Sequence, residues 1–136
     1  MATQTVTNRQ LVELMQGLNE CSELRGVKFA MVVAKNIENI QKELKHIEEA
    51  SKPTDEFRKV AEEVQKLHKD GNEAAAKKLE GEHKDLEQAR QEQLKEVEKL
   101  LEEEATIQLY TIYSDKLPFD ISAKQIMSIR KIVIDN

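Results

Sequence analysis

The sequence Asp70-Gly71-Asn72 marks a turn, and the apolar residues on either side of it decide the fold. Two sets at 3-4-3 spacing precede the turn: Ile37, Ile40, Leu44 and Ile47, then Phe57, Val60, Val64 and Leu67. The returning segment carries Leu79, Leu86, Ala89, Val97, Leu100 and Leu101, with Glu, Lys and Gln at most positions between. Residues at this spacing form the narrow seam that a coiled-coil partner covers. The pattern predicts a mainly α fold with a long antiparallel coiled-coil hairpin over residues 35–104, its tip near 70–72.

The outgoing arm of this hairpin is interrupted by Ser51-Lys52-Pro53-Thr54. Proline inside a helix removes a backbone hydrogen bond but is tolerated in a first turn. We therefore expect a kink or break here, with Ser51 or Thr54 capping a second helix that runs to about Lys69. The returning helix is expected to be continuous from about 72 to 104.

The N-terminal segment predicts a short strand and a capped helix. Residues 4–6 look extended, and Thr7-Asn8-Arg9-Gln10 has the form of a capping box. In such a box the Thr7 hydroxyl accepts the Gln10 amide, and the Gln10 side chain reaches back to the backbone of Thr7. We expect a helix over residues 8–24 that stops at Gly26.

The C-terminal segment changes period. Residues 106–113 alternate and are rich in β-branched and aromatic side chains, which predicts a strand that pairs with residues 3–6. A loop over 114–120 and a last helix over 122–132 follow, with Ser122 and Gln125 as a second capping box. The segments 6–14 and 121–129 share one pattern, either as two ordinary helix starts or as two related helices packed side by side. We expect a single domain in which 1–34 and 105–136 form a small α/β head with a two-stranded sheet on the hairpin stalk 35–104.

Two groups of residues in the head are candidates for binding a partner. Residues 27–34 are apolar nearly all round the helix, so they should be covered from several sides. Three aromatic residues lie between positions 110 and 119, where they either close the core of the head or form an interface. The predicted strand also has an open edge that could accept a strand from another chain. The candidate partner-binding residues are Phe29, Val32, Tyr110, Tyr113 and Phe119.

Composition limits the function. The net charge of −5 over 136 residues argues against general nucleic-acid binding, which depends on Lys and Arg neutralising phosphates. Cys21 is the only cysteine, so no disulfide framework is expected. No apolar run approaches a membrane span, and the first residues lack the features of a signal peptide. We therefore expect a protein of a reducing, intracellular compartment without membrane contact.

The best enzymatic candidate is a pair of Glu-x-x-His motifs, Glu43…His46 and Glu80…His83. Di-iron bundles use this spacing because both ligands then face the same way. In one hairpin the two motifs would lie roughly 27 Å apart along the axis, too far to share a metal. We therefore expect no catalytic residues, no metal and no cofactor.

The chain resembles a family of small, uncharacterised proteins of tailed bacteriophages and prophages. The resemblance rests on Val6 to Leu18, on Lys28-Phe29-Ala30 to Lys35-Asn36, and on Leu117-Pro118 with Ser122 to Gln125. It implies a phage protein in the host cytoplasm or the virion, and it carries over no catalytic residue. We expect a non-enzymatic protein that makes protein–protein contacts with phage or host proteins, as a virion or assembly component and possible homo-oligomer. The alternative is a regulator or inhibitor that binds a host or defence protein.

Overall fold

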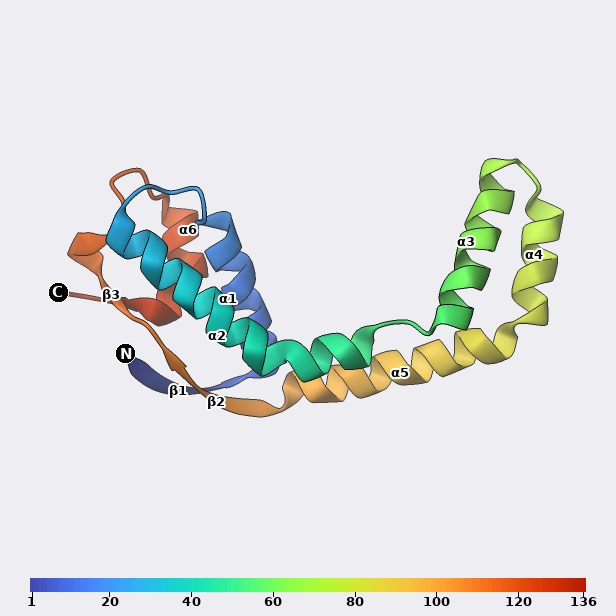
Figure 1. Cartoon of the computed structure of the whole chain (residues 1–136), viewed down its shortest axis with the longest axis horizontal. Helices are drawn as coiled ribbons and strands as arrows, with labels where there is room; N and C mark the ends of the chain where they lie inside the picture. Colours follow the sequence, from blue (N-terminus) through green and yellow to red (C-terminus); the bar gives the residue numbers. More distant parts are fainter. The chain divides into compact units, whose positions relative to one another are not determined.

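The computed structural model describes residues 1–136 and is mainly helical (Figure 1). The chain forms two compact units: unit 1 comprises residues 1–46 and 100–136, and unit 2 comprises residues 47–99. Helices α2 (Val27–Ser51) and α5 (Lys84–Glu102) contribute to both units. Unit 1 therefore includes more of the outgoing helix than the expected head. No helix combines the length and the apolar character that crossing a membrane requires.

The sheet predicted in unit 1 is present. Strand β1 (Ala2–Thr7) pairs antiparallel with β2 (Glu104–Leu109), and Thr5 lies opposite Thr106. Residues of β2 alternate between buried and exposed, as expected for a sheet covered on one face. The strand ends at Leu109, whereas the sequence predicted that it continues to residue 113.

A second, unpredicted sheet follows. Strand β3 (Ile112–Tyr113) pairs in parallel with β4 (Val133–Ile134). Strand β3 lies within the segment 106–113 that was predicted as a strand, but β4 is too short to show a period in the sequence, so this strand and the parallel pairing were missed. Between them lie the 3-10 turns η1 (Ser114–Lys116) and η2 (Arg130–Ile132) and helix α6 (Ala123–Ser128). The last helix is therefore shorter than the expected 122–132.

Helix α1 (Asn8–Glu20) packs on α6. This side-by-side packing was one of the two alternatives for the similar segments 6–14 and 121–129. The contact is close: a Cβ on Gly17 would lie 2.6 Å from the backbone oxygen of Ser128. Helix α1 ends before Gly26, contrary to expectation. Gly26 instead precedes α2 with a φ of 122°, and its carbonyl accepts the Ala30 amide at 2.8 Å.

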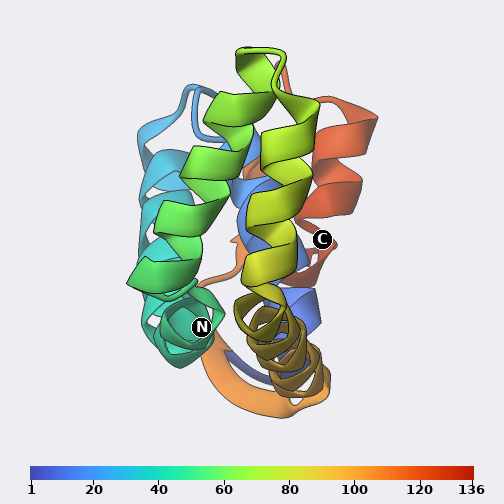
Figure 2. The same cartoon turned by 90° about the vertical axis from the view of Figure 1, so that its right-hand side faces the viewer.

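Unit 2 contains the hairpin tip, where α3 (Asp55–Lys69) and α4 (Glu73–Glu82) pack against each other (Figure 2). Thr54 caps α3 by accepting the Phe57 amide at 3.2 Å, and Gly71 makes the turn with a φ of 74°. The break near Pro53, the end of α3 and the turn are as predicted.

The returning helix is not continuous, which corrects the sequence prediction. It breaks at His83, where α4 ends with φ −121° and α5 begins at Lys84. The His83 amide bonds to the carbonyl of Glu80, three residues back, and the His83 carbonyl accepts the first amides of α5. Gly81 weakens the helix just before the break by about 1 kcal/mol relative to Ala. Leu79 and Leu86 on either side of the break keep a seven-residue spacing, so the seam gave no sign of the break.

Two side chains of α5 hold the segment before Pro53 in place. Arg90 donates to the Ser51 carbonyl at 2.7 Å, and Gln93 donates to the carbonyls of Ala50 and Lys52, both at 2.7 Å. The last carbonyls of a helix have no partner within it and need donors from elsewhere. Arg90 and Gln93 supply these donors at the end of α2.

Candidate protein-contact surface

Phe29 and Val32, two of the predicted partner-binding residues, belong to the core of unit 1. Their exposed fractions are 2% and 9%, and Val33 and Asn36 are buried beside them. These residues recur at three- and four-residue spacing and therefore share one side of α2. Because that side packs inward, neither Phe29 nor Val32 can contact a partner in this structure, and their assignment as partner-binding residues is corrected.

The opposite side of α2 is apolar and exposed. Val27 is 80% exposed and Met31 is 52% exposed, and Ala30 and Ala34 are also exposed. Their spacing of i, i+3, i+4 and i+7 places them on one face of the helix. We call Val27, Ala30, Met31 and Ala34 the α2 strip. The prediction that residues 27–34 are covered from several sides is wrong, because unit 1 covers only the other side.

The surroundings of the α2 strip carry positive charge. Residues 24–37 include Arg25, Lys28 and Lys35, and the carboxylates of Glu23 and Glu38 lie just outside this range, Glu38 one turn beyond Ala34 and paired with Lys42. Lys28 and Lys35 are seven residues apart and therefore flank the strip on the same side. The Lys35 ammonium lies 4.9 Å from the centre of the Tyr110 ring, a cation–π contact.

Tyr110, another predicted partner-binding residue, is half-buried and fixed by α2. The Asn36 side chain donates to the Tyr110 carbonyl at 2.9 Å and accepts the Tyr110 amide at 2.7 Å. Asn36 is fully buried. Its side-chain amide makes the two backbone hydrogen bonds that a neighbouring strand would otherwise supply where β2 ends. Tyr110 thus closes the core of unit 1 and presents one ring face to Lys35.

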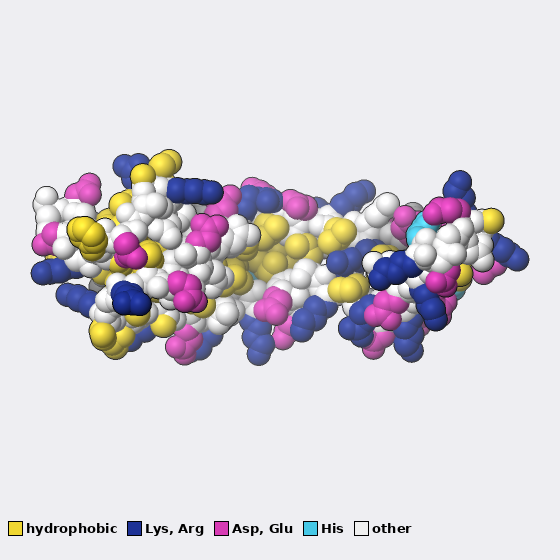
Figure 3. All heavy atoms as spheres, turned by 90° about the horizontal axis from the view of Figure 1, so that it is seen from above, with side chains coloured by type: hydrophobic (Ala, Val, Ile, Leu, Met, Phe, Trp, Pro, Cys, Tyr) yellow, Lys and Arg dark blue, Asp and Glu magenta, His cyan; other side chains and the backbone are white.

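Tyr113 and Phe119 are exposed, as a partner-binding role requires. Tyr113 is 53% exposed and lies opposite Ile134, which is 39% exposed, in the β3–β4 pair. Phe119 is fully exposed in the segment after η1. Figure 3 shows hydrophobic atoms at the surface of unit 1, at its left. Because large exposed aromatic side chains favour contact with other proteins, these two remain candidates.

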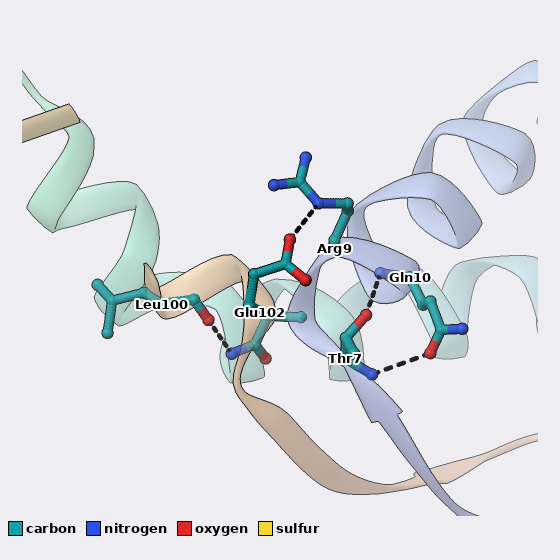
Figure 4. Close-up of polar contacts among 6 residues, drawn as sticks. Thr7, Arg9, Gln10, Leu100 and Glu102 are labelled. Carbon is teal, nitrogen blue, oxygen red and sulfur yellow. Dashed lines mark hydrogen bonds and ion pairs between the residues drawn. The ribbon is translucent and has the colours of Figure 1, made fainter. Parts of the chain in front are cut away.

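The predicted capping residues are structural. Thr7 accepts the Gln10 amide at 3.1 Å and donates its own amide to the Gln10 side chain at 2.9 Å (Figure 4). Ser122 and Gln125 repeat this arrangement at the start of α6. Both capping boxes are therefore confirmed.

The first turn of α1 is also tied to the end of α5. The buried Asn8 donates its side-chain amide to the Leu100 carbonyl at 2.8 Å, and Arg9 pairs with Glu102 at 2.8 Å (Figure 4). The residues that carry the sequence resemblance, Asn8 and Asn36 among them, thus include several that hold the fold of unit 1.

Unit 2 contains an apolar groove of about 340 Å³ between α3, α4 and the start of α5. Its charged lining residues are Glu80 and Glu87, and no Lys or Arg lines it. The apolar residues of α3 are only partly buried, and no residue of that helix is fully buried. The lining residues are Phe57, Val60, Ala61, Val64, Gln65, His68, Glu80, His83, Leu86 and Glu87.

One histidine of this groove, His68, lies close to two carboxylates. His68 lies 3.1 Å from Glu73 and 3.8 Å from Glu80, and all three side chains are substantially exposed. Glu43 and His46 lie elsewhere, in unit 1. No group of three or more His, Cys, Asp or Glu side chains is arranged to hold a metal ion.

Cys21 lies buried at the end of α1 and is not part of any polar cluster. Burial raises the pKa of its thiol, and the nearby carboxylate of Glu20 raises it further. A thiol with a raised pKa is a poor nucleophile at neutral pH.

Sequence reasoning missed the α2 strip, because a polar residue in its neighbourhood, Asn36, suggested the opposite side of the helix as the exposed one. Asn36 shares a helix face with Phe29, and a polar residue on an otherwise apolar helix usually marks the solvent side. Here Asn36 is buried because it has a backbone partner 74 residues away in the chain, which local spacing does not reveal. Comparison with family models, curated proteins and solved structures gives no match for this chain.

Proposed function

We propose that this chain is a non-enzymatic phage protein that makes protein–protein contacts, and that the α2 strip is its main contact surface. The observation that carries the proposal is the exposure of Val27 and Met31 on a helix whose other side is anchored in a core. A rigid helix with an apolar face can dock against another protein without first becoming ordered. The phage origin rests on the sequence resemblance.

A role in the virion or in its assembly is favoured within this proposal. Assembly proteins act in many copies, and the open two-stranded sheets and apolar strip give unit 1 several surfaces for repeated contacts. We also propose that α3 and α4 continue the seam of a coiled coil, because Val60, Val64 and Leu67 keep the 3-4 spacing on a half-buried face. The alternative function is a regulator or inhibitor that binds a host or defence protein through the same strip.

A photo-reactive amino acid at position 31, introduced into the chain in phage-infected cells, tests the contact surface. We expect crosslinks from position 31 to a discrete protein, and none from the exposed position Glu13 on α1, which serves as the control. Absence of any crosslinked species from position 31 would contradict the proposal.

The copy number in purified phage particles separates the two roles. A fixed number of copies per particle is expected of a virion component. Absence from particles, together with a crosslink to one host protein, would instead favour the regulator.

A further inference from the structure

The α2 strip and the unit 2 groove are complementary in shape and in charge. The strip is a convex helical face with Arg25, Lys28 and Lys35 beside it, and Glu38 lies one turn beyond its end at Ala34. The groove is concave and apolar, and its only charged lining residues are Glu80 and Glu87. From this match we infer that the strip of one copy docks into the groove of a second copy, so that the chain assembles head to tail. The inference rests on the proposed function and names its partner.

Both surfaces carry apolar side chains that remain accessible to solvent and would be buried by docking. Phe57, Val60 and Val64 line the groove and remain only partly buried, although their 3-4 spacing is that of a buried helix face. Val27 and Met31 project from a helix with small residues, Ala30 and Ala34, beside them. Small residues let the backbone of one helix approach another surface closely, while the larger side chains fill the groove.

The charges set the orientation. Lys28 and Lys35 lie on one flank of the strip, and docking brings them towards Glu80 and Glu87 at the groove. Exposed ion pairs add little affinity, but they fix the register and speed the encounter of the two surfaces. Added salt screens these pairs and therefore slows the encounter of the two surfaces.

The contact joins two different surfaces, which determines how the assembly grows. Each bound copy still presents one unused strip or one unused groove, so association continues to an open chain or a closed ring. A symmetric contact, in which both copies use the same surface, would stop at two copies. This difference allows a direct test.

The test uses one variant for each surface. Met31→Glu puts a charge into the strip, and Ala61→Glu puts a side chain and a charge into the groove. Both positions are exposed and helical, so neither change disturbs a buried residue. Leu94→Glu, at an exposed position of α5 outside both surfaces, is the matched control. Val27→Glu repeats the strip test at an independent position.

Light scattering coupled to size exclusion measures the result. We expect the wild type and Leu94→Glu to exceed 15.6 kDa increasingly with concentration, and each single-surface variant to stay at 15.6 kDa with unchanged circular dichroism. An equimolar mixture of Met31→Glu and Ala61→Glu should form a species of two chains and grow no further. In that pair, the intact groove of the first binds the intact strip of the second, and both remaining surfaces are blocked.

Three results would overturn the inference: a wild type that stays at 15.6 kDa, single variants that still form pairs, or a mixture that does not associate. The proposed function fails separately. A chain that remains monomeric but crosslinks from position 31 to another protein keeps the contact surface and excludes the second copy as its partner.

Discussion

Asn36 on α2 binds the backbone of Tyr110 through both ends of its side-chain amide, accepting the amide hydrogen at 2.7 Å and donating to the carbonyl at 2.9 Å. This pair joins the helix that carries the exposed strip to the point where β2 ends. It also fixes which side of α2 is buried, because a fully buried amide with two backbone partners cannot rotate towards solvent without losing both.

Replacing Asn36 by Ala should lower the free energy of unfolding by on the order of 2–4 kcal/mol, because two buried backbone groups of Tyr110 lose their partner. Urea denaturation followed by circular dichroism measures the change. Asn39→Ala is the control, since Asn39 makes only one long bond, at 3.4 Å to the carbonyl of Gln108. Equal effects of the two substitutions would contradict the role assigned to Asn36.

Two glycine substitutions should act in opposite directions. Gly17→Ala brings a Cβ to 2.6 Å from Ser128 and forces α1 and α6 apart, which costs about 1–3 kcal/mol. Gly81→Ala meets nothing within 4 Å and removes a helix-weakening residue, so it should stabilise by about 0.5–1 kcal/mol. Thermal or urea denaturation of both variants checks the signs. A neutral Gly17→Ala would mean that the helices are not in close contact.

The contribution of the first capping box to the free energy of unfolding should be measurable as well. Thr7→Ala removes the acceptor for the Gln10 amide and should cost about 1 kcal/mol, whereas Thr7→Ser keeps the hydroxyl and should cost less. The comparison of the two variants in urea isolates the cap from other effects of the substitution. If Ser and Ala destabilise equally, the hydroxyl is not the stabilising group.

Cys21 should make stability depend on pH in the alkaline range. Its pKa is raised in the folded chain, chiefly by burial, so the folded state holds the thiol proton more tightly than the unfolded state. This contribution is fully present below the ordinary thiol pKa and is lost as the pH rises through the raised value. Between the ordinary thiol pKa and the raised value, the unfolding free energy of the wild type should therefore fall more steeply with pH than that of Cys21→Ala, in parallel urea titrations. Identical slopes for the two proteins would contradict the raised pKa.

Local chemistry explains which features were predictable from sequence. The capping boxes at Thr7 and Ser122, the cap at Thr54 and the turn at Gly71 each depend on a few neighbouring residues, and all of them were expected. The β1–β2 pairing was also predictable, because residues 106–113 alternate and needed a partner.

Features that depend on distant contacts were not predictable. The β3–β4 pair joins segments of two residues, and the break at His83 lies between Leu79 and Leu86, whose seven-residue spacing suits a continuous helix. The assignment of Phe29 and Val32 failed for the same reason. Residues 27–34 are apolar nearly all round the helix, so their spacing does not show which side faces the core. The bonds from Asn36 to the distant Tyr110 lie on the side that does.

The α2 strip should act as a surface for another copy of the chain. The most direct test is the weight-average mass of the wild type across a wide concentration range at low salt, with Met31→Glu measured alongside. We predict that the mass of the wild type rises above 15.6 kDa with concentration and that the mass of the variant does not. A wild type that remains at 15.6 kDa at every concentration would contradict it.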